Sequence, residues 1–205
     1  MSILEYNGGA VIAMVGKDCV AIASDTRFGV QGQTLATDMP KIHRMNDKTM
    51  IGFAGLTTDA QTLHNRFKFR MNMYKLRENR EMEPEVFANL VSTMLYEKRF
   101  GPYFVEPVIA GLQGPEHKPF ITAMDLIGAP LKAADFVISG TCTDALYGTC
   151  ESLYKPNLEP EDLFEVISQA LLSSVNRDAF SGWGAVVYIM TPTEFIVKEL
   201  QGRQD

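Results

Sequence analysis

"AVIAMVGKDCVAIASD" (residues 10–25) contains two short apolar runs, separated by Lys17 and Asp18. Each run has the length of a strand, and the second ends at Asp25. A charged pair between two such runs predicts a β-hairpin with both strands largely buried. Strands that are apolar on both faces must be covered on both sides, and this requirement decides the fold class.

The remaining segments extend this pattern outward from the hairpin. A second hairpin is predicted from 41–45 and 49–55, and further strands from 107–113, 119–127, 135–140, 184–191 and 194–200. A change of period predicts a helix from Thr58, with its apolar stripe at Leu63, Phe67, Met71 and Tyr74 and a cap at Thr57, Thr58 or Asp59. Three more helices are predicted, one opening at Pro84, one over about 142–154 and one over 160–176.

Strands and helices therefore come in groups rather than in alternation, which favours an α+β fold with mainly antiparallel sheets. Two sheets packed face to face, with helices outside, would hide both faces of the strands. The sequence thus predicts a four-layer α-β-β-α sandwich. Because no linker or repeat interrupts residues 1–205, a single domain is expected.

Composition narrows the classes of function. The net charge of −6 argues against nucleic acid as a main partner. No apolar run approaches the roughly 20 residues of a membrane span, and the start of the chain lacks a signal-peptide pattern. An odd number of cysteines without metal-binding spacing (Cys19, Cys142 and Cys150) indicates a reducing compartment rather than a disulfide scaffold.

Metal, phosphate and dinucleotide motifs are absent from the sequence. His43, His64 and His117 have no nearby carboxylate or cysteine at ligand spacing, so no metal or catalytic role is expected for them. The basic segment from His64 to Arg80 is interpreted as a solvated face or a protein contact. No cofactor is expected.

Polar residues at the ends of predicted strands form a scattered constellation. They are Asp25, Lys41, Gly55, Ser139, Asp178 and Ser181. Strand ends are rigid supports on which reactive groups can be held. Taken singly, however, each has a structural explanation as a turn, capping or surface residue, and no general pattern selects it.

A family resemblance selects these residues. The sequence resembles the β-type subunits of the proteasome core particle, a branch of the N-terminal-nucleophile hydrolases. The resemblance covers nearly the whole chain. The stretches that carry it are NGGAVIAM (7–14), VAIASDTR (20–27), PKIHRM (40–45), IGFAGLTTD (51–59), LYEKRFGPYFVEPVIAG (95–111), FVISGT (136–141) and NRDAFSGWG (176–184). The resemblance implies the same four-layer fold.

Active members of that family expose an N-terminal threonine as the nucleophile, after cleavage behind a glycine. The resemblance places Gly8 at the preceding glycine and Gly9 at the nucleophile. It places Asp25 and Lys41 beside the nucleophile, and Gly55 at the oxyanion-stabilising N–H. Ser139, Asp178 and Ser181 fall on supporting positions. Since Gly9 has no hydroxyl, the resemblance implies a catalytically silent subunit with a retained polar cluster. Only eight residues precede Gly9, so no long propeptide is expected.

The implied role is architectural. In this family two outer α rings and two inner β rings, of seven subunits each, degrade ubiquitin-targeted proteins in the cytosol and nucleus. The expected partners are β subunits of the same and the opposite ring and α-ring subunits. Asp125 matches a position that borders a neighbour's substrate pocket, and is hypothesised to tune that neighbour's specificity. Two alternatives are an independent hydrolase that uses Ser2 and a free-standing binding module.

Overall fold

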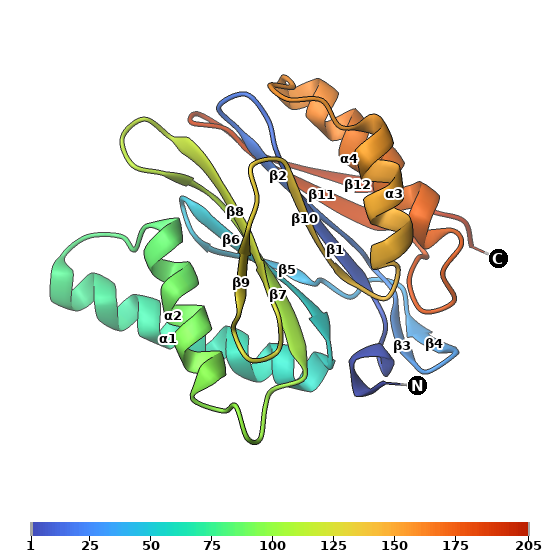
Figure 1. Cartoon of the computed structure of the whole chain (residues 1–205), viewed down its shortest axis with the longest axis horizontal. Helices are drawn as coiled ribbons and strands as arrows, with labels where there is room; N and C mark the ends of the chain where they lie inside the picture. Colours follow the sequence, from blue (N-terminus) through green and yellow to red (C-terminus); the bar gives the residue numbers. More distant parts are fainter. Residues whose placement is uncertain (1, 205) are drawn as a thin grey trace.

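The computed structural model describes residues 2–204 and contains two five-stranded antiparallel sheets (Figure 1). The first sheet has the order β10 (Phe136–Gly140), β1 (Ala10–Val15), β2 (Val20–Asp25), β11 (Ala185–Met190) and β12 (Phe195–Leu200). The second has the order β5 (Ile42–Asn46), β6 (Thr49–Gly55), β7 (Val105–Gln113), β8 (Lys118–Met124) and β9 (Pro130–Lys132). The predicted hairpins 10–25 and 41–55 are confirmed as β1–β2 and β5–β6.

Helices cover the outer face of each sheet. Figure 1 shows α3 (Thr143–Leu153) and α4 (Pro160–Val175) beside the first sheet, and α1 (Thr57–Glu78) and α2 (Pro84–Tyr96) beside the second. Three apolar clusters fill the spaces between the resulting layers. The predicted α+β, four-layer α-β-β-α sandwich is confirmed.

Alternation along β1 explains why its sequence is apolar throughout. Ala10, Ile12 and Met14 face the cluster under α3 and α4. Val11 and Ala13 face the second sheet and share a cluster with residues of β7 and β8. Val11 and Ala13, which a strand with one solvated face would expose to water, are therefore buried, because a layer lies on either side.

The start of α1 differs from the expectation of a side-chain cap at Thr57, Thr58 or Asp59. Leu56 is the N-cap and supplies no side-chain acceptor. The Thr57 N–H instead donates to Oδ1 of Asn7, fifty residues away, at 3.0 Å. The Asp59 carboxylate accepts the N–H of Phe104. The predicted stripe is confirmed, since Leu63, Phe67 and Met71 are buried and Tyr74 is partly buried against the same cluster.

Short elements escaped the sequence patterns. These are the 3-10 turn η1 (Ile3–Glu5), the strands β3 (Phe28–Val30) and β4 (Gln33–Ala36), which form a separate two-stranded sheet, and β9. The strand predicted over 119–127 ends at Met124, because the Asp125 carboxylate accepts the N–H groups of Ile127 and Ala129 and turns the chain. Within residues 2–204, no helix has the length and apolar content needed to cross a membrane.

Candidate functional site

Gly9 immediately precedes β1 and has a backbone conformation that favours glycine, with φ of +116°. A Cβ built at this position would lie 2.7 Å from Cε and 3.2 Å from Nζ of Lys41. Gly8 also has positive φ, and a Cβ there would collide with the Phe180 carbonyl oxygen at 1.9 Å. Residue 9 is therefore next to the lysine, as expected, on a path that the two glycines make possible.

Asp25 and Lys41 form a buried ion pair beside Gly9, with Nζ 2.8 Å from Oδ1. Oδ1 of Asp25 also accepts the Ala10 N–H at 2.9 Å. Oδ2 accepts the N–H groups of Arg27 at 3.3 Å and Gly182 at 3.1 Å. The carboxylate thus joins the start of β1 and the end of β2 to the turn before β11.

The Lys41 ammonium is fully engaged. Besides the Asp25 carboxylate, Nζ donates to the main-chain oxygens of Asp25 at 3.2 Å and Arg27 at 2.7 Å. An ammonium has three N–H donors, so the three contacts use them all. Burial lowers the pKa of Lys41 below its ordinary value, and the neighbouring Asp25 charge opposes that shift.

A second polar cluster surrounds Asp178. Its Oδ2 accepts the Ser181 hydroxyl at 2.5 Å and the Thr141 hydroxyl at a shorter distance. The Thr141 N–H also donates to the Gly9 carbonyl at 3.0 Å. Thr141 thus connects Asp178 and Ser181, which the resemblance implies as supporting residues, with the main chain of Gly9.

Ser139 lies outside this cluster, and its expected placement there is corrected. It shares a face of β10 with Val137, which packs between the two sheets. The Ser139 hydroxyl consequently points toward β7 and bonds to the carbonyl and the carboxylate of Glu106, both at 3.1 Å. Gly140, with φ of +121°, then turns the chain so that Thr141 reaches Asp178.

Arg27 is a further member of the site that the sequence patterns missed. Its side chain is 1% exposed and donates to oxygens of Thr34, Phe180 and Gln31 at 2.9–3.0 Å. A buried cation satisfied in this way fixes the β3–β4 sheet against the 178–182 turn. Nothing in the residues around "DTR" distinguishes it from an exposed arginine.

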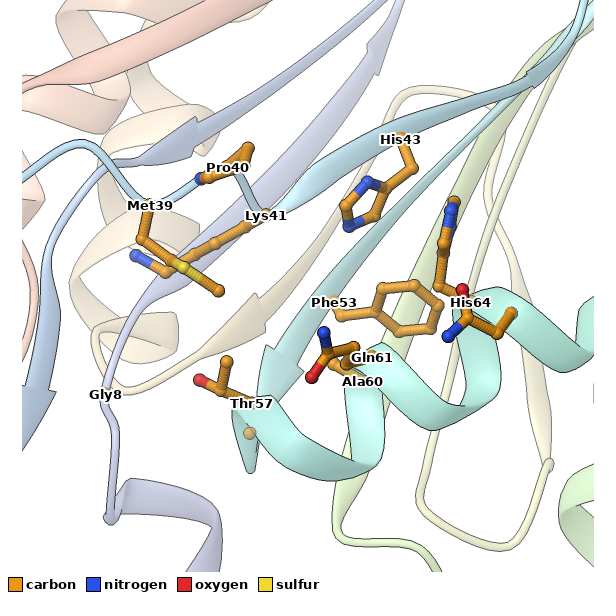
Figure 2. A pocket seen from close by; sticks show the side chains of 12 residues that line it. Gly8, Met39, Pro40, Lys41, His43, Phe53, Thr57, Ala60, Gln61 and His64 are labelled. Carbon is orange, nitrogen blue, oxygen red and sulfur yellow. The ribbon is translucent and has the colours of Figure 1, made fainter. Parts of the chain in front are cut away.

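A cavity of about 330 Å³ lies beside Gly8 and Lys41 (Figure 2). Its lining includes Gly8, Lys41 and Gly55, and is otherwise mainly apolar or aromatic, with Met39 and Phe53 prominent. Gly55 ends β6 with φ of +109°. The glycine expected to stabilise an oxyanion therefore lies in the same cavity as the lysine.

Two imidazoles form the far side of this cavity. The rings of His43 and His64 are 4.2 Å apart between centroids (Figure 2). Burial, assisted by the neighbouring His64, lowers the pKa of His43 to about 4. Burial and Lys68 lower the pKa of His64 as well. Among residues 2–204, no group of three or more His, Cys, Asp or Glu side chains could hold a metal ion.

The family model for proteasome subunits matches residues 5–190 of this sequence. The chain belongs to the proteasome subunit family. Relatives named "Proteasome subunit beta type-3" cover it along its whole length of 205 residues, and it covers all of theirs. The relative from Dictyostelium discoideum is 60% identical, and that from Drosophila melanogaster is 54% identical. "Proteasome subunit beta type-3-A" from Arabidopsis thaliana is 62% identical. The predicted resemblance to proteasome β-type subunits is confirmed.

Ser2 of this proteasome-family chain does not join the polar clusters. Its hydroxyl accepts the Leu4 N–H at 3.3 Å, and its own N–H donates to the Glu5 carboxylate at 3.0 Å. Both groups are exposed and cap η1. The alternative of an independent hydrolase that uses Ser2 is not favoured.

Asp125 lines a different cavity of the proteasome-family fold, together with Glu106, Ser139 and Thr143. Its Oδ1 accepts the N–H groups of Ile127 at 3.1 Å and Ala129 at 2.8 Å, which stabilises the turn after β8. Asp125 thus lines a different cavity from Lys41, and Glu106 is a second carboxylate in the Asp125 cavity.

The cysteines of the proteasome-family chain are free and buried. Burial raises the pKa of Cys142 and of Cys150 to about 12 each, and that of Cys19 to about 11. Such thiols stay protonated at neutral pH and behave as small core side chains.

Proposed function

We propose that the chain is a catalytically silent β-type subunit of the proteasome core, where it completes a β ring and shapes the chamber in which active neighbours cleave proteins. The observation that carries the proposal is the polar corner at Gly9, where Asp25 and Lys41 form a buried ion pair. Position 9 has no attacking oxygen, and the lysine beside it donates all three of its N–H groups to other acceptors. A nucleophile cannot be activated where none exists.

Large exposed apolar side chains support an assembled role. Phe69 and Leu76 of α1 are 62% and 80% exposed, and Phe100, in the turn after α2, is 94% exposed. A subunit in a hetero-oligomeric ring needs at least two distinct contact faces. The partners in this proposal are β subunits of the same and the opposite ring and α-ring subunits, in the cytoplasm and the nucleus.

Covalent labelling tests the silent site. Native particles would be treated with an electrophile that captures N-terminal threonine, and each subunit would be analysed by intact mass. We expect adducts on active β subunits and none within residues 1–12 of this chain. An adduct in that segment would contradict the proposal.

Native mass spectrometry tests the architectural role independently. The chain, tagged at its C-terminus in cells, should be recovered in a particle that contains α-type and other β-type subunits. Recovery as a monodisperse monomer would favour a free-standing binding module instead. Phe100→Ala should lower incorporation into the particle, whereas the exposed Glu116→Ala in the β7–β8 turn should leave it unchanged.

We also propose that Asp125 tunes the specificity of a neighbouring active subunit toward basic substrate side chains. The carboxylates of Asp125 and Glu106 line one cavity, which gives it an acidic character. Asp125→Asn is a suitable variant, because an amide oxygen can still accept from Ile127 and Ala129 while the charge is lost. Cleavage after basic residues should fall selectively in assembled particles. Equal rates for every substrate class would eliminate this role.

A further inference from the structure

Asn7 is a buried polar side chain that neither the polar clusters nor the cavity explains. It is 6% exposed and lies between η1 and β1. Its Nδ2 donates to the Gly29 carbonyl of β3 at 2.9 Å, and its Oδ1 accepts the Thr57 N–H of α1 at 3.0 Å. One side-chain amide therefore bridges strand β3 and the first turn of helix α1.

Both partners of Asn7 are main-chain groups that their own elements leave open. α1 has no side-chain cap of its own, so the Thr57 N–H depends on Asn7. β3 pairs only with β4 in its two-stranded sheet, so its other edge has free main-chain groups. On that edge the Gly29 carbonyl accepts from Asn7, and the Gln31 N–H donates to the Tyr6 carbonyl at 2.7 Å.

Gly29 lies in β3, and Gln31 directly follows Val30, the last residue of β3, at the start of the turn to β4. Tyr6 and Asn7 therefore lie along the outer edge of β3 and the turn that follows it, and contact them through one main-chain and one side-chain bond. The segment continues into Gly8, which forms part of the wall of the 330 Å³ cavity.

We propose that Tyr6 and Asn7 are a built-in occupant of the β3 edge, and that the Asn7 side chain is the staple that holds this segment there. The chain is then closed to peptides at this edge in addition to lacking a nucleophile. Because Asn7 also caps α1, the staple connects the closed edge with the first turn of the helix that borders the cavity. This inference depends on the proposed function only in using assembled particles as the sample.

Three variants in native particles separate the bonds. Asn7→Ala removes both, whereas Asn7→Asp keeps an acceptor for Thr57 and removes the donor to Gly29. Ser2→Ala is the matched control, since it removes only the exposed cap of η1. Hydrogen–deuterium exchange is measured on peptides that contain Gln31 and Thr57.

Asn7→Ala should accelerate exchange about tenfold at both amides, because Thr57 loses its acceptor and the released segment carries the Tyr6 carbonyl away from Gln31. Asn7→Asp should accelerate exchange at Gln31 alone, and Ser2→Ala at neither. Unchanged exchange at both amides in Asn7→Ala would overturn the staple. Loss of assembly in Asn7→Ala, with normal Asn7→Asp particles, would leave the Gln31 measurement as the deciding one.

A peptide probe tests the closed edge directly. An apolar heptapeptide with a benzophenone side chain is added to particles whose active subunits have been blocked. Photo-crosslinking to this chain should be at background in unmodified and Ser2→Ala particles, and should rise severalfold in Asn7→Ala particles. Equal crosslinking in all three would overturn the proposal that Tyr6 and Asn7 occupy the edge. Because this readout needs no nucleophile, it is independent of whether the silent-site proposal holds.

Discussion

The polar corner at Gly9 and the cavity beside it share Lys41, but they differ in how many hydrogen bonds hold their side chains and in how much open space surrounds them. In the corner, the Asp25 side chain is fully buried, and four N–H groups converge on its two oxygens. In the cavity, about 330 Å³ stays open, and the rings of the two imidazoles lie 4.2 Å apart at an angle of 40°. Groups that connect distant strands are constrained by the fold, whereas groups that only line an opening are not.

The corner should therefore be far more sensitive to substitution than the cavity. Lys41→Met leaves the Asp25 charge buried without its partner, which costs about 3–5 kcal/mol. We expect this variant to be largely absent from assembled particles, as measured by quantitative mass spectrometry. Lys132→Met is the control, because its pair with Glu85 is 57% and 42% exposed and contributes less than about 1 kcal/mol.

Adding Asp25→Asn to Lys41→Met sharpens the test. Removing both charges takes away the unpaired carboxylate, so incorporation should recover in part. A double variant as poorly incorporated as Lys41→Met alone would show that hydrogen-bond geometry, rather than charge, governs the corner.

Restoring the missing side chain is the next largest perturbation. Gly9→Thr places a hydroxyl beside Lys41, but the positive φ costs about 1–3 kcal/mol and Lys41 must shift by several tenths of an ångström. We expect partial loss of residues 1–8 and weak peptidase activity at most, because self-cleavage is intramolecular. Intact mass of the assembled variant measures it.

Gly9→Ala is the matched control, since it introduces the same Cβ and the same strain without a hydroxyl. Its chain should keep residues 2–8. A full-length chain in assembled Gly9→Thr particles would show that the polar cluster is retained for structure alone. Shortening of both variants would point to another protease.

Low pH should lower the stability of the folded chain through His43, which lines the cavity. The pKa of His43 is about 4 in the folded chain, below its ordinary value of 6.5, so protonation favours the unfolded state. The contribution of neutral His43 to the stability of the fold is complete above about pH 6.5 and is lost as the pH falls toward 4. His43→Phe should flatten this part of the thermal stability profile, and His117→Asn should not. Parallel profiles for native protein and His43→Phe would exclude His43 as the cause.

Filling the cavity should have the smallest effect. Ala60 lines the opening, so Ala60→Leu should change stability by less than about 1 kcal/mol. Ala10→Leu adds the same atoms to the packed cluster under α3 and α4, where overpacking costs about 1–3 kcal/mol. Thermal denaturation of particles with each variant gives the comparison. Similar losses for both would mean that the cavity collapses around its lining.

Local patterns predicted the long elements well, because each rests on neighbours in sequence. The apolar runs of β1 and β2 and the stripe of α1 are visible without any tertiary information. β3, β4 and β9 are too short for a period to emerge. The strand predicted through 127 stops at Met124, because a single carboxylate at Asp125 captures two N–H groups.

The site was less predictable, because its contacts join distant parts of the chain. Asp25 and Lys41 were found through family resemblance, and the geometry brings them together. The resemblance implies Ser139 as a supporting residue, but Thr141 occupies the cluster, since the turn at Gly140 cannot be inferred from "VISGT". Asn7 resembles an ordinary turn residue in sequence, and its partners are 22 and 50 positions away.

The carboxylate of Asp25 has a consequence for the order of events during synthesis. It bonds to Ala10 and Lys41, 15 and 16 positions away, and also to Gly182, 157 positions away. The central strand β2 likewise pairs with β11, which leaves the ribosome near the end of translation. Until that segment emerges, the charge keeps its hydration shell and the hairpin that opens the chain has an unpaired edge. Burial of Asp25 is therefore a late step, and a nascent chain stalled before residue 182 exposes a strand edge that chaperones can bind.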